Sequence, residues 1–490
     1  MAPHQPLRTC ALAGLLMLVG TGCIIREPYT RNLDTLTKPQ AQADLDYLQT
    51  QIVAIHPKPE CPEPPSLDER VTQIKDGLAD SVSREDLRLR VSEILASLHD
   101  SHSTTFMLGS FFDHTRSGMP AFPLLLRANS DGMTILDVAE GIDNPALELG
   151  ATITAIDGQP MPTLIDRYER YACAETHSQR LVILEMLLPA MLWRDNGPAD
   201  SYDITLKSKD GSTKTVAVPA STYRFASLKP NPNNEPFPHE FYDNDRACML
   251  HAETFNGNQA EAFHAKLDVV FGELKERNCN VLIVDVRRNA GGSTSLPFDL
   301  LRRVAKEPIR SGQKNWRYSN AYCQAMKISG LHQRKISSIW LFDCILPLQW
   351  FNPVDRSRFE ADGEWLRSKP STIAPYETHW PGQLVVLTDR WSASAAVDLA
   401  SLAQDNKLAA IAGEETGGRA SYCGEIATLL LPNSGITAQV SSSIWTRASG
   451  VQDDRGVIPD IPVNPELDNA TIVRTIMDSL PATSMQTDPA

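Results

Sequence analysis

The segment LVVLTDRWSASAAVDLASLAQDNKLAAIAGEETGGR, residues 384–419, decides the fold of this chain. Its apolar run at 384–387 predicts a buried strand, a polar turn follows, and a helix begins near Ser394. Such a turn lies at the carboxyl end of a sheet, where the amides of the first helical turn stabilise negative charge. Ser394 is therefore a candidate nucleophile, and the amide of Ala395 is a candidate oxyanion donor. The alternative is that Ser394 only caps the helix.

The rest of the carboxyl-terminal half also has the pattern of an α/β core. A helix expected over residues 259–277 precedes the fully apolar run VLIVDV at 281–286. Apolar runs that alternate with helices are typical of buried parallel strands. Residues 294–380 are rich in Trp, Pro and basic residues and are expected to be irregular, as a lid, a substrate-facing subdomain or simply an insertion.

The amino-terminal part has two different patterns. Residues 41–100 predict three amphipathic helices; the first stops at His56, before Pro57, and the third begins at Ser83. From about residue 122 the pattern changes to short strands with turn signals, which predicts a small β-rich module. The strands are expected in FPLLLR, MTILDV, ATITAIDGQPM, YDITLK and TKTVAV, the last two joined as a hairpin across Asp210-Gly211.

Several of these segments resemble the C-terminal processing and tricorn-core serine peptidases. The match comprises the Ser-Ala-Ser-Ala turn at 392–395, Gln404-Asp405 and the Gly-Glu-x-Thr motif at 413–416. VDVRRNAGG at 284–292 is similar to the strand that ends in the family's oxyanion-hole glycines. Ala290 replaces one glycine, so the resemblance points to Gly291 and Gly292 as donors. LELGATITAIDGQPM at 147–161 resembles the closing part of a PDZ domain, a fold that binds peptide ends; a plain β-sandwich insert is the alternative.

One departure from the family pattern decides between two mechanisms. The processing-peptidase branch uses a lysine base, but the corresponding position here is Arg419, whose guanidinium cannot accept a proton at ordinary pH. LHDSHSTTF at 98–106 resembles the histidine signature of the tricorn-like branch, which makes His102 the expected base. The local competitor His99 falls within the helical pattern, so His102 is preferred.

The tricorn-like resemblance also implies groups that orient the histidine. Ser101, which precedes His102, is the first. A carboxylate shortly before Gly456-Val457-Ile458-Pro459-Asp460 is the second, and Asp453 matches it, with Asp454 as the alternate. Either acid could instead cap a turn or face solvent. The resemblance implies no metal and no organic cofactor, because the serine and the oxyanion hole suffice for the chemistry.

The expected fold is therefore a multidomain α/β protein with an N-terminal helical region, a PDZ-like β-rich module and a crotonase-like (ClpP-like) catalytic core. The predicted boundaries are a signal peptide at 1–22, a linker at 23–40, the helical domain at 41–115, the module at 116–225, the core at 240–470 with the insertion 294–380, and a tail at 471–490.

The amino terminus predicts export. Residues 1–22 contain Arg8, an apolar run and then small residues, as a signal peptide does. Cys23 directly follows, which is typical of a bacterial lipoprotein whose cysteine carries a lipid anchor; Gly20 stands where a branched residue is usual, so simple cleavage is the alternative. We therefore expect an exported bacterial protein, in the periplasm or anchored to the outer membrane.

Charge and cysteine content limit the partners. The net charge of −14 becomes −15 once residues 1–22, which include the single base Arg8, are removed. This negative charge argues against nucleic acid as a partner. Seven further cysteines are widely spaced without a CxxC pattern, so one or two disulfides are expected. The sequence does not determine their pairing or the oligomeric state.

Three functions remain open at this stage. The main prediction is a serine peptidase that acts on polypeptide substrates. The alternative is a non-catalytic protein that binds peptides or small hydrophobic ligands on the same fold, which Ala290, Ala396 and Arg419 leave open. A third is a scaffold that acts only through the β-rich module.

Overall fold

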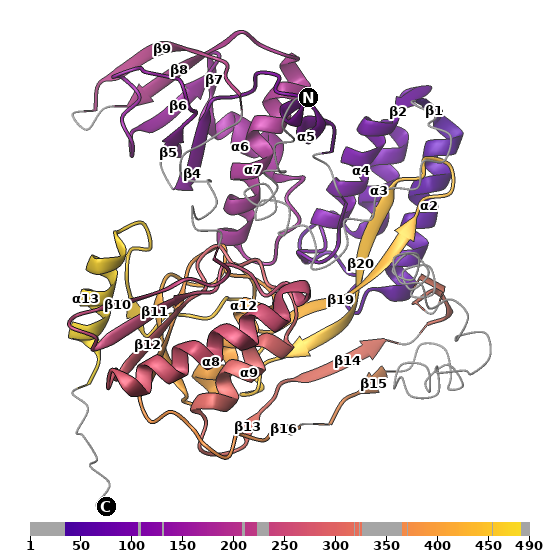
Figure 1. Ribbon diagram of the computed structural model, residues 1–490. Coiled ribbons are helices and arrows are strands. Elements are labelled where there is room, and N and C mark those ends of the chain that lie inside the picture. Colours follow the sequence, from indigo (N-terminus) through magenta and orange to yellow (C-terminus); the bar gives the residue numbers. More distant parts are fainter. Residues whose placement is uncertain are drawn as a thin grey trace, which may run out of the picture. The chain divides into compact units, whose positions relative to one another are not determined.

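The computed structural model describes residues 35–105, 109–129, 132–207, 211–222, 235–317, 319–322, 324–325, 365–369, 371–452 and 454–481 (Figure 1). By its internal contacts the chain divides into two units. Unit 1 comprises Met1–Asn233, Gln313–Lys369 and Ser421–Thr446; unit 2 comprises Asn234–Gly312, Pro370–Ala420 and Arg447–Ala490. The predicted signal peptide, residues 23–34 of the predicted linker, which include Cys23, and the end of the tail lie outside the described residues, whereas residues 35–40 form a short strand and the start of a helix and residues 471–479 continue a helix.

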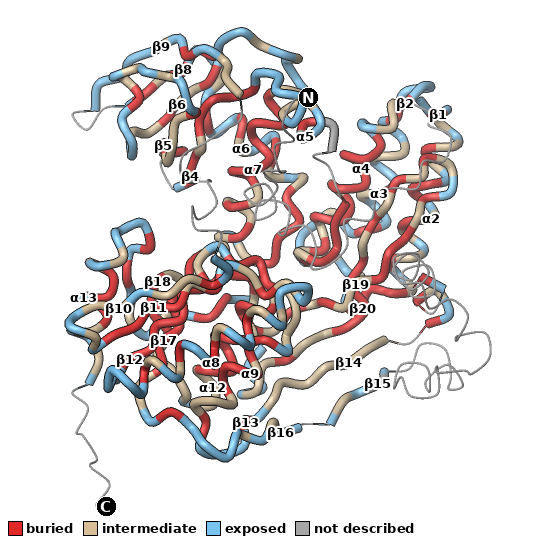
Figure 2. The backbone as a smooth tube through the Cα atoms, in the orientation of Figure 1, coloured by how far each residue is buried: buried red, intermediate tan, exposed pale blue. Residues whose placement is uncertain are grey.

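Unit 1 contains the three predicted amino-terminal helices, which are α2 (Lys38–Ile55), α3 (Leu67–Asp76) and α4 (Arg84–Ala96). As predicted, α2 ends before His56-Pro57, and Ser83 caps α4 by accepting a hydrogen bond from the Asp86 amide. The apolar faces of these helices pack in one core with strands β19 (Tyr422–Leu430) and β20 (Thr437–Thr446). Figure 2 shows the inward sides of α2 and α4 as buried.

β19 and β20 belong to an antiparallel sheet that joins distant parts of the sequence. Its order is β15 (Trp365–Arg367), β14 (Gln313–Arg317), β20 and β19, and the short strand β3 (Thr104–Thr105) also pairs with β20. The β3 pairing sets Thr104 opposite Gln439, which holds the segment after α4 against β20.

The predicted β-rich module is also in unit 1, and its five main strands are confirmed. They run in the order β4-β5-β6-β8-β9 and are all antiparallel, with β8 and β9 forming the predicted hairpin. Their bounds, with the short β7 that pairs with β6, are β4 Leu124–Asn129, β5 Gly132–Val138, β6 Thr152–Ile156, β7 Gln159–Pro160, β8 Ser201–Lys207 and β9 Thr213–Pro219.

The sequence analysis missed two helices of this module, so the description as β-rich was incomplete. These are α6 (Met161–Glu169) and the 20-residue α7 (His177–Asn196). Leucines of α7 pack against β4 in the module core. The helix α7 is apolar on most sides and contains Pro189, so it shows neither helical periodicity nor an uninterrupted helix-forming composition.

Unit 2 contains a six-stranded sheet in the order β10-β11-β12-β17-β18-β21. Only β10, at one edge, is antiparallel, so the predicted parallel core is confirmed. The strands are β10 His239–Tyr242, β11 Ala247–His251, β12 Val281–Asp285, β17 Gln383–Thr388, β18 Ala409–Gly413 and β21 Ile461–Pro462.

Helices cover both faces of this sheet, which explains why its central strands are apolar throughout. Alternate residues of each strand, such as Leu282 and Val284, pack with α8 (Ala260–Glu276), α9 (Ser295–Val304) and α12 (Ala395–Asp405). The intervening residues, such as Ile283, pack with α13 (Asn469–Ser479) on the other face. Every residue of β12 is buried, and Figure 1 labels the strands and helices of this core.

One further prediction needs correction. The segment 294–380 is not irregular throughout, because α9 is part of the α/β core and β14 joins the sheet of unit 1; β13 (Ile309–Arg310) and β16 (Thr372–Ile373) pair with each other. No disulfide joins any two of the five cysteines that the structure describes, namely Cys61, Cys173, Cys248, Cys279 and Cys423. Cys323 and Cys344 lie outside the described residues, so the expectation of one disulfide stays a prediction.

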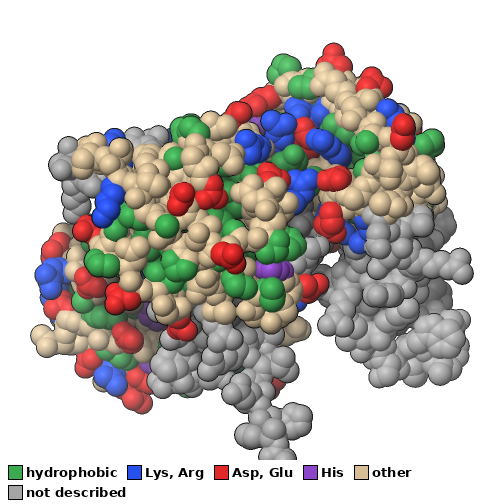
Figure 3. Space-filling model, turned by 90° about the horizontal axis from the view of Figure 1, so that it is seen from above, with side chains coloured by type: hydrophobic (Ala, Val, Ile, Leu, Met, Phe, Trp, Pro, Cys, Tyr) green, Lys and Arg blue, Asp and Glu red, His purple; other side chains and the backbone are tan. Residues whose placement is uncertain are grey.

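Four short elements remain. β1 (Thr35–Thr37) and β2 (Ser81–Ser83) pair with each other in an antiparallel two-stranded sheet, and the other two are α5 (Gly109–Arg116) and η2 (Gly257–Gln259). None of the described helices has both the length and the apolar character needed to cross a membrane. On the face shown in Figure 3, acidic side chains are scattered and lie among basic ones.

Candidate active site

Ser394 occupies the predicted turn between β17 and α12 in a strained backbone conformation. It is the N-cap residue of α12, with φ 52° and ψ −121°. A positive φ is costly for a residue with a Cβ, about 1–3 kcal/mol, and such strain is concentrated at functional sites. The Ser394 side chain makes no capping hydrogen bond to α12. Helix capping therefore does not explain this serine.

The buried carboxylate of Asp389 holds this turn in place. Its Oδ1 accepts hydrogen bonds from the amides of Arg288 at 3.0 Å, Trp391 at 2.9 Å and Ser392 at 3.1 Å. Arg288 belongs to the glycine motif and the other two residues to the serine turn, so one oxygen ties both motifs together. Burial raises the pKa of Asp389 to about 6, although the amide hydrogen bonds from Arg288 and Trp391 lower it.

The glycine motif lies directly against Ser394. A Cβ on Gly291, whose φ is 103°, would lie 2.6 Å from the Ser394 Cβ and 2.9 Å from the Ala395 nitrogen. Only glycine fits there. A Cβ on Gly292 would lie 2.0 Å from the Phe255 carbonyl oxygen, so this position also excludes a side chain.

The two predicted glycine donors differ in how their amides are used. The Gly291 amide donates to Asn289 Oδ1 at 2.8 Å, and Asn289 is fully buried. An oxyanion would have to displace this hydrogen bond to reach Gly291. The amides of Gly292 and Ala395 are therefore the stronger candidate donors, and Gly291 is required for the close approach.

The other family-like motifs of unit 2 form the scaffold of the serine turn. The amide of Gly417 donates to the Ser392 carbonyl at 3.0 Å, and Thr416 Oγ1 accepts from the Val457 amide at 2.8 Å. A Cβ on Gly456 would lie 2.1 Å from the Thr416 carbonyl oxygen. These contacts give Gly413–Thr416 and the segment from Gly456 to Asp460 a structural role.

Of the predicted acids, Asp453 lies outside the described residues. The alternate, Asp454, has a side chain that is 89% exposed and forms an ion pair with Arg419 at 3.4 Å. Exposure of this kind does not suit a residue that must hold an imidazole in a water-poor site.

His102, the predicted base, lies in unit 1 between α4 and β3 and is buried. Asp100 organises its backbone, since Oδ1 accepts from the His102 amide at 2.9 Å and Oδ2 accepts from Ser103 Oγ at 2.5 Å. His56 Nε2 lies 3.1 Å from Asp100 Oδ2. Burial alone would raise the pKa of Asp100, but the hydrogen bond and charge of His56, together with His102, lower it to about 2.

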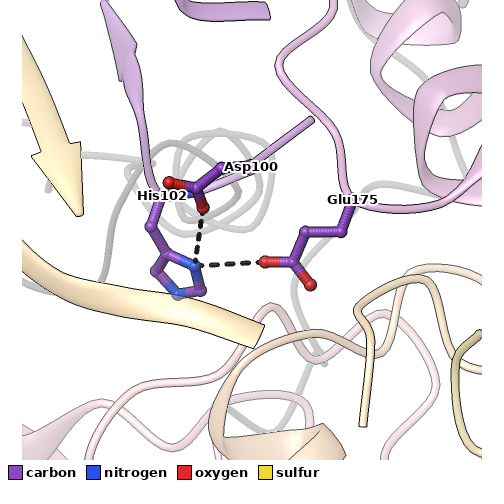
Figure 4. A group of neighbouring side chains, drawn as sticks. All are labelled: Asp100, His102 and Glu175. Carbon is purple, nitrogen blue, oxygen red and sulfur yellow. Dashed lines mark hydrogen bonds and ion pairs between the residues drawn. The ribbon is translucent and has the colours of Figure 1, made fainter. Parts of the chain in front are cut away.

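The imidazole of His102 faces a second carboxylate, Glu175, which the sequence analysis did not single out. His102 Nδ1 lies 3.3 Å from Glu175 Oε1 and 3.8 Å from Asp100 Oδ1 (Figure 4). Ser101 Oγ donates to Glu175 Oε1 at 2.7 Å. The ring of Tyr422 stacks on His102 with centroids 5.4 Å apart and 17° between the planes.

His99 requires a correction. α4 ends at Ala96, and His99 has φ 50° in the connection that follows, so it does not belong to the helix as expected. Arg180 Nη2 donates a hydrogen bond to His99 Nε2 at 3.1 Å. His99 thus has a local structural partner.

The ligand atoms of Asp100, His102 and Glu175 lie within 4.8 Å of one another, a spacing that could also hold a cation. Both carboxylates, however, already accept hydrogen bonds from the protein: Asp100 from Ser103 and the His102 amide, Glu175 from Ser101. These donors account for the arrangement.

The structure thus assembles two parts of the predicted site. In unit 2, Ser394 lies with Gly291 and Ala395 at the amino terminus of α12; in unit 1, His102 lies with Ser101, Asp100 and Glu175. The pairing of Ser394 with His102 stays a prediction.

A strained serine at a helix amino terminus beside a glycine turn, on a parallel α/β core, is an arrangement that suits a nucleophile with an oxyanion hole. Residues 246–463 match the description Peptidase family S41, so the chain contains an S41 peptidase domain. The family resemblance inferred from the serine and glycine motifs is thereby confirmed.

Solved structures share the fold. Mature CPAF is 16% identical with a TM-score of 0.59, over 87% of this chain and 92% of that chain. Mature CPAF complexed with lactacystin has the same identity and TM-score, over 87% and 94%. A CPAF mutant is 16% identical with a TM-score of 0.61, over 90% and 95%. No curated protein matches the chain.

Proposed function

We propose that this chain is an exported serine peptidase that hydrolyses peptide bonds with Ser394 as nucleophile and His102 as general base. The S41 domain supports a peptidase with a polypeptide substrate. The observation that carries the assignment of Ser394 is its strained φ of 52° at the start of α12, with Gly291 packed against it.

In the proposed reaction, His102 Nε2 takes the Ser394 hydroxyl proton while Oγ bonds to the peptide carbonyl carbon. Nε2 is the nitrogen assigned this role because Nδ1 faces Glu175. The carbonyl oxygen becomes an oxyanion, which the amides of Gly292 and Ala395 would stabilise. His102 then gives its proton to the leaving amine as the C–N bond breaks, and water hydrolyses the acyl-enzyme by the same path.

Arg419 supports a histidine base rather than a lysine base. Its guanidinium stays protonated and is paired with Asp454, so this position cannot activate the serine. Asp453 stays a proposed catalytic acid from the family resemblance, whereas the exposure of Asp454 argues against it as the alternate.

A fluorophosphonate probe tests this proposal in the purified full-length chain. We expect the probe to label Ser394, Ser394→Ala to abolish labelling, and His102→Gln to slow it by at least about 100-fold. Ser401→Ala is the matched control, because Ser401 lies on the same helix and only donates to the Asp398 carbonyl.

The opposite outcome supports the alternative function. A folded, monodisperse wild-type protein that resists labelling but binds peptides or small hydrophobic ligands would be a non-catalytic member of the fold. Peptide binding that survives Ser394→Ala, with no turnover in the wild type, would instead identify a scaffold acting through the module.

Export and lipid anchoring are a separate part of the proposal. Residues 1–22 and Cys23 support a lipoprotein signal, which would place the protein in the periplasm or at the outer membrane. Radiolabelled palmitate should enter the wild-type chain but not Cys23→Ser, and recovery of the Cys23→Ser protein in the soluble fraction would match the loss of an anchor.

A further inference from the structure

We propose that Glu175 is the residue that positions His102 and stabilises its protonated form. This inference rests on the proposed function only for the role given to His102. The contacts themselves lie within unit 1, between the segment after α4 and the start of α7.

Glu175 is held rigidly at the amino terminus of α7. Its amide donates to Gln179 Oε1 at 2.8 Å, while the Gln179 amide donates to Thr176 Oγ1, the N-cap, at 3.1 Å. This reciprocal pair fixes the backbone on both sides of the helix start.

The buried Glu175 side chain directs its Oε1 toward two residues of the histidine segment. Oε1 accepts from Ser101 Oγ at 2.7 Å and lies 3.3 Å from His102 Nδ1, and only 3% of the side chain is exposed. A carboxylate buried to this degree is costly unless it is paired. An imidazolium at His102 would supply the opposite charge during catalysis.

Asp100 does not take this role, although it is the other acid that faces His102. Its Oδ1 is 3.8 Å from Nδ1 and accepts from the His102 amide, and its Oδ2 is paired with His56. Asp100 therefore fixes the backbone of the segment, whereas Glu175 acts on the ring. The stacked ring of Tyr422 fixes the plane of the imidazole.

The arrangement assigns the ring proton. With Nδ1 directed to Glu175, the proposal assigns the hydrogen of the neutral imidazole to Nδ1 and makes Nε2 the nitrogen that accepts the serine proton. Ser101, predicted from the sequence to orient the site, does so by holding the Glu175 oxygen.

The test compares Glu175→Gln, which keeps the shape but removes the charge, with the wild type. We expect kcat to fall about 10- to 100-fold with KM within about twofold, because the charge acts only when His102 is protonated. The acid limb of the pH–rate profile should move to lower pH, since the imidazole then loses its proton more easily. Glu175→Asp should recover part of the loss.

A second readout does not depend on activity. In Ser394→Ala protein labelled with ¹³C and ¹⁵N at histidine, the His102 signal is identified by its loss in His102→Gln and titrated by NMR. The midpoint should lie at lower pH in Glu175→Gln. Asp166→Asn, which removes an exposed acid of α6 in the same unit, is the matched control and should leave the midpoint unchanged.

The two proposals fail in different ways. If Glu175→Gln leaves both the His102 midpoint and the acid limb unchanged while Ser394 and His102 remain essential, the positioning role is refuted and the hydrolase stands. If the midpoint moves but the wild type neither labels nor hydrolyses, the positioning role holds and the proposed function fails.

Discussion

Asp389→Asn should make the chain more stable near neutral pH, and the gain should appear in a defined pH window. Asp389 is buried at the base of the serine turn, where desolvation raises its pKa from 3.8 to about 6. A raised folded-state pKa means that the folded protein binds the proton more tightly than the unfolded chain. The carboxyl therefore imposes no penalty below about pH 4, and a penalty grows as the pH rises through about 6.

The size of this penalty follows from the shift. Roughly two pKa units at 1.36 kcal/mol each give about 3 kcal/mol, reached above about pH 7. Asparagine keeps an oxygen that accepts the three turn amides but never ionises. The difference in the free energy of unfolding, variant minus wild type, should thus increase by about 3 kcal/mol between pH 4 and pH 7.

Urea unfolding followed by circular dichroism at intervals from pH 4 to pH 7.5 measures this difference. Fluorophosphonate labelling should stay within a few-fold of wild type, whereas Asp389→Ala, which removes the acceptor, should lose most labelling. A stability difference that does not vary with pH would refute the claim that Asp389 is buried as a charge at neutral pH.

Three other predictions concern single contacts. Gly291→Ala should abolish probe labelling, because its Cβ would fall 2.6 Å from that of Ser394; unchanged labelling would disprove the close approach. His56→Ala should lower the free energy of unfolding at pH 7 by about 1–3 kcal/mol, because it leaves the buried Asp100 Oδ2 without its hydrogen bond to His56. Because the pKa of Asp100 is depressed to about 2, this stability is present above about pH 4 and should be lost as the pH falls toward 2 in acid-unfolding curves. Burial alone would lower the pKa of His251, but Asp285 raises it. The protonated His251 therefore stabilises the fold below its unfolded pKa of about 6.5. The difference in the free energy of unfolding between wild type and His251→Gln should shrink as the pH rises from 6 to 9.

The elements that the sequence predicted are those with strong local signals. β12 and β17 are apolar at every position because helices cover both faces of their sheet, and α8 follows a clear helical period. The serine turn was found because a strand, a polar turn and a helix follow one another directly. These signals depend on neighbours in the chain.

The features that the sequence did not reveal depend on distant contacts. α7 is apolar on most sides and contains Pro189, so its period is hidden. Glu175 precedes that helix and meets His102 only through tertiary packing, and no local pattern marks it. The hydrogen bond from the Gly291 amide to Asn289 Oδ1 likewise depends on how the Asn289 side chain is oriented, which the spacing of the motif cannot show.

The central claim is that the Ser394 hydroxyl passes its proton to His102. A crystal structure of the active full-length chain, with the serine adduct confirmed by peptide mass spectrometry in parallel, tests it directly. The account predicts His102 Nε2 within hydrogen-bond reach of Ser394 Oγ, at ~2.6–3.2 Å. A separation too large for even one bridging water, in a crystal form that still reacts with the probe, would contradict it.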